Sequence, residues 1–225
     1  MPLRAAVFDF DGVLVDSEPL HFRSLSDALE DDGILITEEE YWGIYLAHDD
    51  RGAIRLALEQ HGHTAEPQWI EAIAARKAAR FAELIPEVPV FPGAREIVAA
   101  LGAEIPLAIA SGARHGEIEA ILAGLGLRDA FVAIVGAEDA PRTKPDPAPY
   151  LEAARRLAES APDLLPTECL AFEDSVPGIA SALGAGMKVV GVAHSFPEDK
   201  LRSAHRVVGS LVGLARDNLR GLFPE

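Results

Sequence analysis

The sequence VFDFDG, at residues 7–12, begins as an apolar strand and ends in two carboxylates and a glycine. Residues two apart in an extended segment point to the same side, so Asp9 and Asp11 can both face the space beyond the strand. Gly12 allows the chain to turn away abruptly. Ionised carboxylates at the edge of an apolar core are costly unless a cation or hydrogen-bond donors compensate them. The pattern therefore predicts a buried strand whose end requires a partner of opposite charge.

The composition is that of a globular, acidic protein. The chain has 225 residues, of which 49% are hydrophobic, so it can bury a substantial core as one large domain or as a domain with a smaller insert. Its formal net charge of −16 gives no long-range attraction for a polyanion, which argues against a nucleic acid or an anionic membrane as partner. If the substrate is anionic, its attraction must be local.

Cysteine usage and hydropathy bear on the compartment. The single cysteine, Cys169, lies in an apolar run, so we expect a small buried side chain and no intrachain disulfide. The amino terminus lacks the apolar core and cleavage site of a signal peptide, and no later apolar run approaches membrane-spanning length. We therefore expect a cytoplasmic protein.

The segment after the first strand carries helical patterns only. Apolar positions recur at helical spacing, and helices are predicted over residues 18–31, 38–47, 50–61 and 67–84. A proline-rich connector follows at residues 85–93. We therefore predict a helical insert over residues 17–87, within a domain made of residues 1–16 and 88–225.

From residue 94 onward, helices alternate with short apolar strands. Strands are predicted over residues 106–110, 131–135, 169–172 and 188–192, with a weaker one near Val207. Helices are predicted over residues 94–101, 114–125, 148–160 and 176–183, and from about residue 211. Apolar strands separated by helices are typical of a parallel sheet covered on both faces through right-handed crossovers. The predicted fold class is α/β, with a doubly wound parallel sheet.

Polar side chains follow the ends of these strands. They are Asp9 and Asp11 after the first strand, Ser111 after the second, Lys144 in the loop after the third, and Glu173 and Asp174 after the fourth. Ligands of open parallel sheets bind at the carboxyl edge, near the switch in strand order. Four separate segments are therefore expected to converge on one site.

The expected site requires a cation. Two carboxylates about 4 Å apart repel each other by about 4 kcal/mol at an effective dielectric constant near 20. A few hard oxygen ligands with room for water suit Mg²⁺, which is commonly completed by a substrate phosphate. Mg²⁺ and one lysine would also supply the positive charge that the protein lacks, which points to phosphoryl chemistry.

Four motifs then occur in a familiar order. They are FDFDG at residues 8–12, Ser111-Gly112, Lys144-Pro145 and Glu173-Asp174-Ser175. Together they span the chain, and it resembles the haloacid dehalogenase (HAD) superfamily of aspartate-nucleophile phosphotransferases. The resemblance implies a Rossmann-like core with an inserted α-helical cap domain over residues 17–87. Such a cap closes over the site, excludes water and reads the leaving group.

The resemblance also implies roles for the first motif. Asp9 would be the nucleophile that accepts the phosphoryl group as an aspartyl phosphate. Asp11 would protonate the leaving alcohol and then activate water, while its backbone carbonyl binds the metal. The dehalogenases that name the superfamily lack a second aspartate at this spacing, so Asp11 favours cleavage of a phosphate ester over cleavage of a carbon–halogen bond.

The other motifs complete the implied site. Ser111 and the Gly112 amide would hold the transferring phosphoryl oxygens, and Lys144 would neutralise the charge of the nucleophile and of the phosphoryl group. Asp174, aided by Glu173, would anchor Mg²⁺, so that the implied metal site comprises Asp9, Asp11, Glu173 and Asp174.

The start of the predicted cap bears on the substrate. The sequence SEPLH at residues 17–21 is similar to the β-phosphoglucomutase and sugar-phosphatase branch, and Glu18, His21 and Arg51 are its candidate substrate contacts. His21 equally fits a helix-surface histidine without a function. Leu25 stands where mutases carry an aromatic residue, and Arg51 is displaced by about one position. His115 replaces an amide side chain expected near the phosphate, and these departures favour hydrolysis over mutase activity.

We therefore expect a monomeric, Mg²⁺-dependent phosphatase that acts on a small phosphorylated metabolite such as a sugar phosphate. One alternative is a phosphosugar mutase of the β-phosphoglucomutase type. A second alternative, from another class, is a non-catalytic ligand-binding or regulatory member of the fold, against which the intact pair Asp9 and Asp11 argues.

Overall fold

The computed structural model describes residues 2–223, which divide into two compact units. Of the described residues, the α/β unit comprises 2–16 and 89–223, and the helical unit comprises 17–88. The chain leaves the first unit and returns to it along adjacent segments, because the Asp16 amide donates to the Pro89 carbonyl at 3.0 Å.

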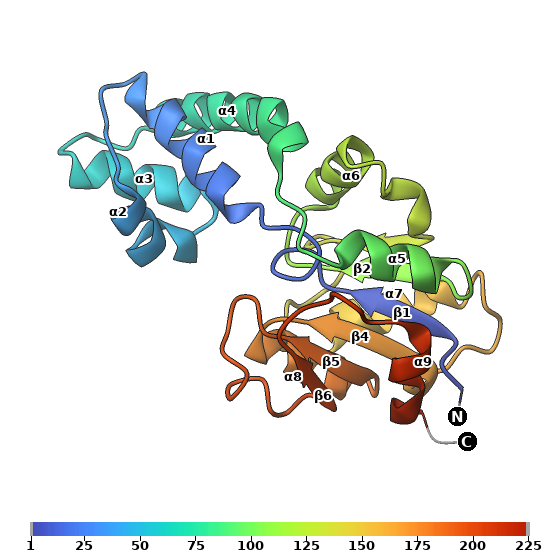
Figure 1. Cartoon of the computed structure of the whole chain (residues 1–225). Coiled ribbons are helices and arrows are strands. Elements are labelled where there is room, and N and C mark those ends of the chain that lie inside the picture. Colours follow the sequence, from blue (N-terminus) through green and yellow to red (C-terminus); the bar gives the residue numbers. More distant parts are fainter. Residues whose placement is uncertain (1, 224–225) are drawn as a thin grey trace. The chain divides into compact units, whose positions relative to one another are not determined.

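A parallel sheet forms the centre of the α/β unit (Figure 1). Its strands are β1 (Ala5–Phe8), β2 (Leu107–Ala110), β3 (Ala133–Val135), β4 (Cys169–Glu173), β5 (Lys188–Val192) and β6 (Arg206–Val208). They lie in the order β3-β2-β1-β4-β5-β6, and every neighbouring pair is parallel. The chain order reverses at β1, so the carboxyl ends of β1 and β4 lie where such sheets bind ligands.

Strand β1 is central because both of its faces are apolar. All four of its residues are buried, and Val7 pairs with Ala108 on one side and with Ala171 on the other. On one face, the Phe8 ring stacks on Phe172 with centroids 4.5 Å apart. The backbone N–H and C=O groups of a buried strand cannot bond to water, so they need hydrogen-bond partners on both sides. A strand of this kind therefore lies between two neighbouring strands.

Helices cover both faces of the sheet (Figure 1). They are α5 (Ala94–Gly102), α6 (His115–Gly124), α7 (Ala148–Leu157), α8 (Val176–Gly184) and the short α9 (Arg216–Leu219), with 3₁₀ turns η3 (Arg128–Ala130), η4 (Pro166–Glu168) and η5 (Arg220–Leu222). Buried side chains of α7 and α8, among them Tyr150 and Ile179, share one apolar cluster with Val7. Helices α5 and α6 pack on β2 and β3 and contribute nothing to that cluster, so they cover the other face. The doubly wound α/β fold is confirmed.

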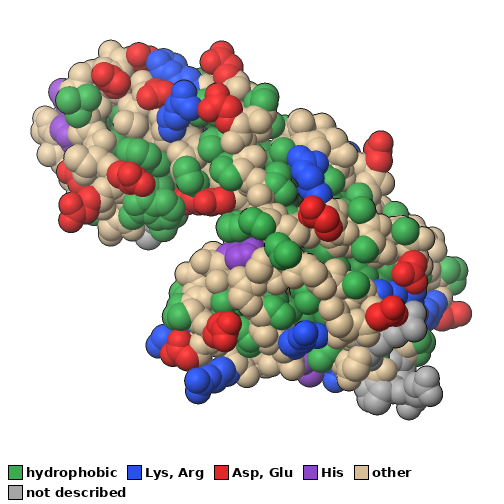
Figure 2. Space-filling view, viewed as in Figure 1, with side chains coloured by type: hydrophobic (Ala, Val, Ile, Leu, Met, Phe, Trp, Pro, Cys, Tyr) green, Lys and Arg blue, Asp and Glu red, His purple; other side chains and the backbone are tan. Residues whose placement is uncertain are grey.

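The helical unit has its own apolar core. Its elements are α1 (Glu18–Glu30), α2 (Glu38–Gly43), η1 (Tyr45–Ala47), α3 (Asp50–Gln60), α4 (Pro67–Leu84) and η2 (Ile85–Glu87). Helices α1 and α4 pack together, and buried residues such as Leu29, Ile54 and Ile73 form one cluster. Hydrophobic side chains also reach the surface of this unit (Figure 2). On the face shown, Lys and Arg side chains lie scattered among Asp and Glu (Figure 2).

Two of the expected helices depart most from their predicted bounds. The helix expected over residues 38–47 ends at Gly43, a poor helix former, and Ile44 has φ −127° before a separate 3₁₀ turn begins. The helix expected from residue 211 begins only at Arg216, because Gly213 turns the chain at φ +75°. Among residues 2–223, the longest and most apolar helices still fall short of what crossing a membrane requires.

Candidate active site

Asp9 lies buried at the carboxyl end of β1. Its backbone amide donates to the Phe172 carbonyl at 2.9 Å, which continues the pairing with β4 by one residue. Its Oδ1 accepts from the Phe10 amide at 2.7 Å. Gly12, two residues beyond Phe10, has φ +77°, and a Cβ there would lie 2.0 Å from Asp174 Oδ2. Only glycine fits this turn, which brings the first motif against the fourth.

Lys144 joins the first motif to the fourth. Its Nζ lies 2.8 Å from Asp9 Oδ1 and donates to Glu173 Oε1 at 2.6 Å. Burial alone would lower the pKa of Lys144, but the two carboxylates raise it above its ordinary value. Burial and the charge of Glu173 raise the pKa of Asp9 well above its ordinary value, despite the opposing effect of the ammonium group. The cluster therefore carries more negative charge than one lysine compensates.

Glu173 is fully buried and surrounded by hydrogen-bond donors. Its Oε1 also accepts from the Tyr150 hydroxyl at 2.9 Å, while Oε2 accepts from the Asp174 amide at 3.0 Å and from the Ser175 amide and hydroxyl at 3.1 and 3.0 Å. Burial would raise the pKa of Glu173, but Lys144 and these donors hold it below its ordinary value. Because its lone pairs are occupied, Glu173 is better suited to orient Lys144 than to bind a cation.

Asp174 faces the turn after β1. The Ser195 hydroxyl, in the loop after β5, lies beside the same turn and acts to lower the pKa of Asp174. Burial is the main reason that the pKa of Asp174 rises to about 6, with the Glu173 charge acting in the same direction. A buried carboxylate of this kind gains by binding a cation.

The acidic cluster fits a hard divalent cation. One oxygen from each of Asp9, Glu173 and Asp174 lies within 4.8 Å of the others. Oxygen ligands in small number, with the charge imbalance described above, suit Mg²⁺. The Asp11 carboxylate is not a member of this group, whereas the sequence-based expectation placed its backbone carbonyl at the metal.

Ser111 and Gly112 lie beside Lys144. The three residues line one cavity of about 170 Å³, together with residues of the loop after β3 such as Gly136 and Thr143. Ser111 is buried, and its hydroxyl accepts from the Ala113 amide at 3.0 Å. The α/β unit thus brings together Asp9, Ser111, Gly112, Lys144, Glu173 and Asp174.

The candidate residues of the helical unit have partners within that unit. Glu18 accepts a short hydrogen bond from the Tyr41 hydroxyl. His21 stacks on Phe81 with centroids 4.3 Å apart, and its Nδ1 lies 2.9 Å from Lys77 Nζ.

Arg51 is held in an exposed ion pair. Its guanidinium donates twice to the Glu71 carboxylate, at 2.6 and 2.8 Å. Two donor atoms of the Arg51 guanidinium are therefore already engaged within the helical unit.

Sequence reasoning missed three polar residues. Lys77 is only 3% exposed and donates to Asp50 at 2.5 Å, the Tyr150 hydroxyl donates to Glu173, and the Ser195 hydroxyl lies near Asp174 and acts to lower its pKa. Lys77 lies on the apolar face of α4, between Ile73 and Phe81. A lysine at helical spacing among apolar residues could have indicated from the sequence that this side chain is buried. Tyr150 and Ser195 follow no motif and gain their partners only through the fold.

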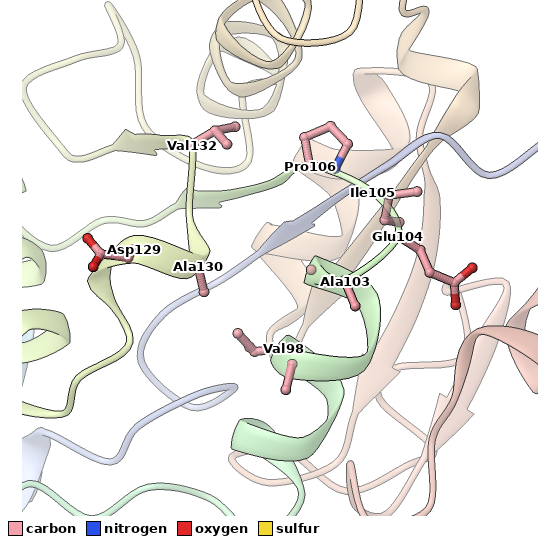
Figure 3. A pocket seen from close by; sticks show the side chains of 10 residues that line it. Val98, Ala103, Glu104, Ile105, Pro106, Asp129, Ala130 and Val132 are labelled. Carbon is pink, nitrogen blue, oxygen red and sulfur yellow. The ribbon is translucent and has the colours of Figure 1, made fainter.

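A second cavity, of about 460 Å³, lies near the amino end of strand β2, whereas the candidate site lies at the carboxyl ends of the strands (Figure 3). It precedes β2 and is lined largely by small apolar residues of α5 and η3. Its charged lining residues, Glu104 and Asp129, are both acidic, so it does not suit a phosphate.

The doubly wound sheet, the helical insert after its first strand and the buried carboxylate–lysine cluster are features of an α/β enzyme, and the candidate site lies at the switch point of the sheet. Residues 3–186 match the family model for haloacid dehalogenase-like hydrolases, and the chain belongs to that family. It is therefore an HAD-like hydrolase, as the order of its motifs predicted.

Several known proteins are similar to this chain in sequence or in structure. Hexitol phosphatase B of Escherichia coli K12 is 32% identical over 225 residues, which cover 96% of each chain. The structure of CbbY from Rhodobacter sphaeroides in complex with phosphate is 27% identical, has a TM-score of 0.77, and is matched over 94% of this chain and 96% of that one. A putative β-phosphoglucomutase from Thermotoga maritima is 28% identical, also with a TM-score of 0.77, over 91% and 94% of the two chains.

Proposed function

We propose that the protein is a Mg²⁺-dependent phosphatase that hydrolyses the monoester of a small sugar or sugar alcohol. The observation that carries the proposal is the position of Lys144, whose Nζ lies 2.8 Å from Asp9 while the residue lines a cavity with Ser111 and Gly112. A phosphoryl group in that cavity would meet a nucleophile, an ammonium group and a hydroxyl. The similarity to hexitol phosphatase B supports a sugar-alcohol phosphate as substrate class.

Asp9 and Asp11 would share the chemical work. An Asp9 carboxylate oxygen forms a bond to phosphorus while the bond from phosphorus to the ester oxygen breaks, and Asp11 gives its proton to the departing alcohol. Asp11 then takes a proton from water, whose oxygen attacks phosphorus and releases Asp9 and inorganic phosphate. The nucleophile and the acid–base group thus both return to their starting states.

The remaining residues would stabilise charge. Asp9 and Asp174, with the Asp11 carbonyl, would hold Mg²⁺, which when bound neutralises charge on the phosphoryl oxygens. A nearby cation would also oppose the raised pKa of Asp9 and favour its ionised, nucleophilic form. Glu173 keeps Lys144 in place, and Ser111 with the Gly112 amide would donate to phosphoryl oxygens.

The helical unit would act as the cap that reads the leaving group. Its polar contacts around Glu18, His21 and Lys77 support this role, because burying charge in a small helical unit is expensive without a function. Arg51 would take part only after leaving Glu71. The expectation of a cytoplasmic monomer stays a prediction.

Phosphate release from a panel of phosphorylated metabolites tests the proposal. The panel includes hexitol phosphates, sugar phosphates and phosphoglycolate, each with Mg²⁺ and with chelator. We expect Mg²⁺-dependent release that Asp9→Asn abolishes, whereas Asp129→Asn, an exposed control on η3, leaves it unchanged. Release by the Asp9→Asn variant at the wild-type rate would exclude the covalent route.

The similarity to the putative β-phosphoglucomutase keeps mutase activity as a second candidate. Conversion of a sugar 1-phosphate to the 6-phosphate, primed by a sugar bisphosphate, would identify a mutase. A complete lack of hydrolysis and isomerisation across the panel would instead favour a non-catalytic member of the fold.

A further inference from the structure

Two loops at the carboxyl edge of the sheet are joined backbone to backbone. The Ser111 amide donates to the Val135 carbonyl at 3.0 Å, and the Ala137 amide donates to the Ala113 carbonyl at 2.8 Å. A Cβ on Gly136 would lie 2.5 Å from the His115 amide nitrogen, so only glycine permits this approach. One loop carries Ser111 and Gly112, and the other leads to Lys144.

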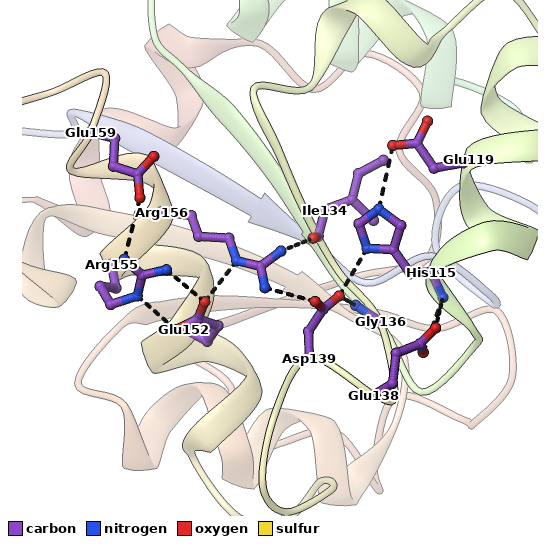
Figure 4. A network of polar contacts seen from close by, with 10 residues as sticks. All are labelled: His115, Glu119, Ile134, Gly136, Glu138, Asp139, Glu152, Arg155, Arg156 and Glu159. Carbon is purple, nitrogen blue, oxygen red and sulfur yellow. Dashed lines mark hydrogen bonds and ion pairs between the residues drawn. The ribbon is translucent and has the colours of Figure 1, made fainter.

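The Asp139 carboxylate ties these loops together (Figure 4). Its Oδ2 accepts from the Gly136 amide at 2.8 Å and from His115 Nδ1 at 2.9 Å, and its Oδ1 accepts from Arg156 Nη2 at 2.7 Å. One side chain thus joins the loop after β3, the first turn of α6 and the helix α7. Burial acts against ionisation, but these donors lower the pKa of Asp139 to about 2, which agrees with a charged hub.

The partners of Asp139 are themselves fixed. Arg156 donates to the Ile134 carbonyl of β3 at 2.6 Å and to Glu152 at 2.7 Å, which anchors the guanidinium to the sheet (Figure 4). The amide of His115 donates to Glu138 at 3.2 Å, so the start of α6 meets the loop after β3 at two points. The network is therefore a rigid connection between the sheet and the loop that carries Ser111 and Gly112.

His115 faces three acidic groups in this network. They are Asp139 at Nδ1, Glu119 at 3.5 Å from Nε2, and Glu138 at its backbone amide. Donation to Asp139 uses the Nδ1–H form of the ring. His115 stands where the resemblance led us to expect an amide side chain near the phosphate. Its ring is instead directed into the connection between the two loops.

We propose that Asp139 is a positioning residue for phosphoryl binding. It holds residues 111–114 against the loop after β3, and so sets the distance between the Ser111–Gly112 pair and Lys144 that a phosphoryl group must span. This role rests on the proposed function, because it takes that pair as the phosphate-binding element. An enzyme gains from such preorganisation because misplacing one donor weakens binding and turnover together.

Two substitutions of Asp139 separate loop placement from charge. Asp139→Ala removes all three acceptor contacts. Asp139→Asn can keep its oxygen toward Gly136 and His115 and lose only the contact with Arg156. Arg155→Ala is the matched control, because Arg155 pairs with Glu152 on α7 and with Glu159 just beyond it, and bonds neither loop (Figure 4).

The readouts are kcat and KM for a substrate found in the panel, and binding of inorganic orthophosphate with Mg²⁺ by titration calorimetry. All variants are measured at a temperature at which circular dichroism finds them folded. We expect Asp139→Ala to weaken orthophosphate binding and to lower kcat, each by about tenfold or more, if one phosphoryl contact is lost. Asp139→Asn should recover most of both, and Arg155→Ala should match wild type.

Three results would overturn the inference. They are orthophosphate binding by Asp139→Ala within twofold of that by Arg155→Ala, an unchanged kcat in Asp139→Ala, or an Asp139→Asn variant as impaired as Asp139→Ala. Failure of the proposed function would give a different result, namely no phosphatase activity in the wild-type protein. In that case the variants can still be compared by their binding of orthophosphate.

Discussion

Replacement of Lys144 by methionine probes the charge balance of the site. The substitution keeps most of the side-chain volume and removes an ammonium group 2.6 Å from Glu173 and 2.8 Å from Asp9. At an effective dielectric constant near 20, each of these attractions corresponds to about 6 kcal/mol. Three buried carboxylates, with oxygens within 4.8 Å of one another, would then face each other without compensation.

The folded variant has a less costly alternative, which is to bind one proton more than wild type. Protonating a carboxyl group of ordinary pKa near 4 costs about 4 kcal/mol at pH 7 and about 1.4 kcal/mol at pH 5. The smaller cost determines the outcome, so we expect Lys144→Met to lose about 4 kcal/mol of unfolding free energy at pH 7, within the range known for broken buried ion pairs. Above pH 4 the unfolded chain has released that proton, so the variant's deficit grows as the pH rises.

Urea denaturation in chelator at pH 5, 6 and 7 measures the deficit. Lys200→Met, at an exposed lysine, is the control and should stay within about 0.5 kcal/mol of wild type. Added Mg²⁺ should restore more stability to Lys144→Met than to wild type, because it supplies the missing positive charge. A deficit that does not change between pH 5 and pH 7 would refute the reasoning, and so would a Lys144→Met variant as stable as the control.

Further expectations concern the same cluster. Because burial raises the pKa of Asp174 to about 6, protons should compete with Mg²⁺ below that pH. The affinity for Mg²⁺, measured by calorimetry, should fall by about tenfold per pH unit from pH 6 to pH 4 and level off above pH 7. An affinity that does not change with pH would contradict the assignment of Asp174 as a metal ligand. A Cβ on Gly178 would lie 1.8 Å from Glu173 Oε1, so Gly178→Ala should lower the free energy of unfolding in chemical denaturation by about 1–3 kcal/mol and reduce kcat. Gly184→Ala on the same helix is the control, because a Cβ there would have its nearest neighbour at 3.4 Å. Equal stability and kcat of the two variants would exclude the steric argument. Tyr150→Phe removes the hydroxyl that donates to Glu173 at 2.9 Å, and thermal and urea unfolding should register a loss of about 1 kcal/mol; an unchanged stability would mean that this bond contributes nothing net.

Local sequence patterns predicted the elements well where burial and periodicity agree. The apolar run before Asp9 is a strand because both of its faces are buried, and Pro67–Leu84 is one helix because its apolar positions recur at helical spacing. The polar residues at strand ends were placed for the same reason, since the carboxyl ends of parallel strands meet at one edge. The family motifs added the order of the segments.

Pairings between distant segments were not predictable from such patterns. Nothing in the sequence indicates that Tyr150 would reach Glu173, because the two residues meet only after α7 packs on the sheet. His115 is similar: its position in the chain suggested the phosphate, whereas its ring bonds Asp139, 24 residues away. Partner choice of this kind depends on the relative placement of helices and loops, which one-dimensional periodicity does not encode.

The central place of β1 has a consequence for how the protein forms during synthesis. Phe8 pairs with Ile109 on one side and with Phe172 on the other, so β1 is synthesised more than 150 residues before its second neighbour exists. The helices at residues 17–88 have their own apolar cluster and can collapse earlier. Closing such long loops makes assembly of the sheet a late step, during which an apolar strand followed by Asp9 is still without its neighbours.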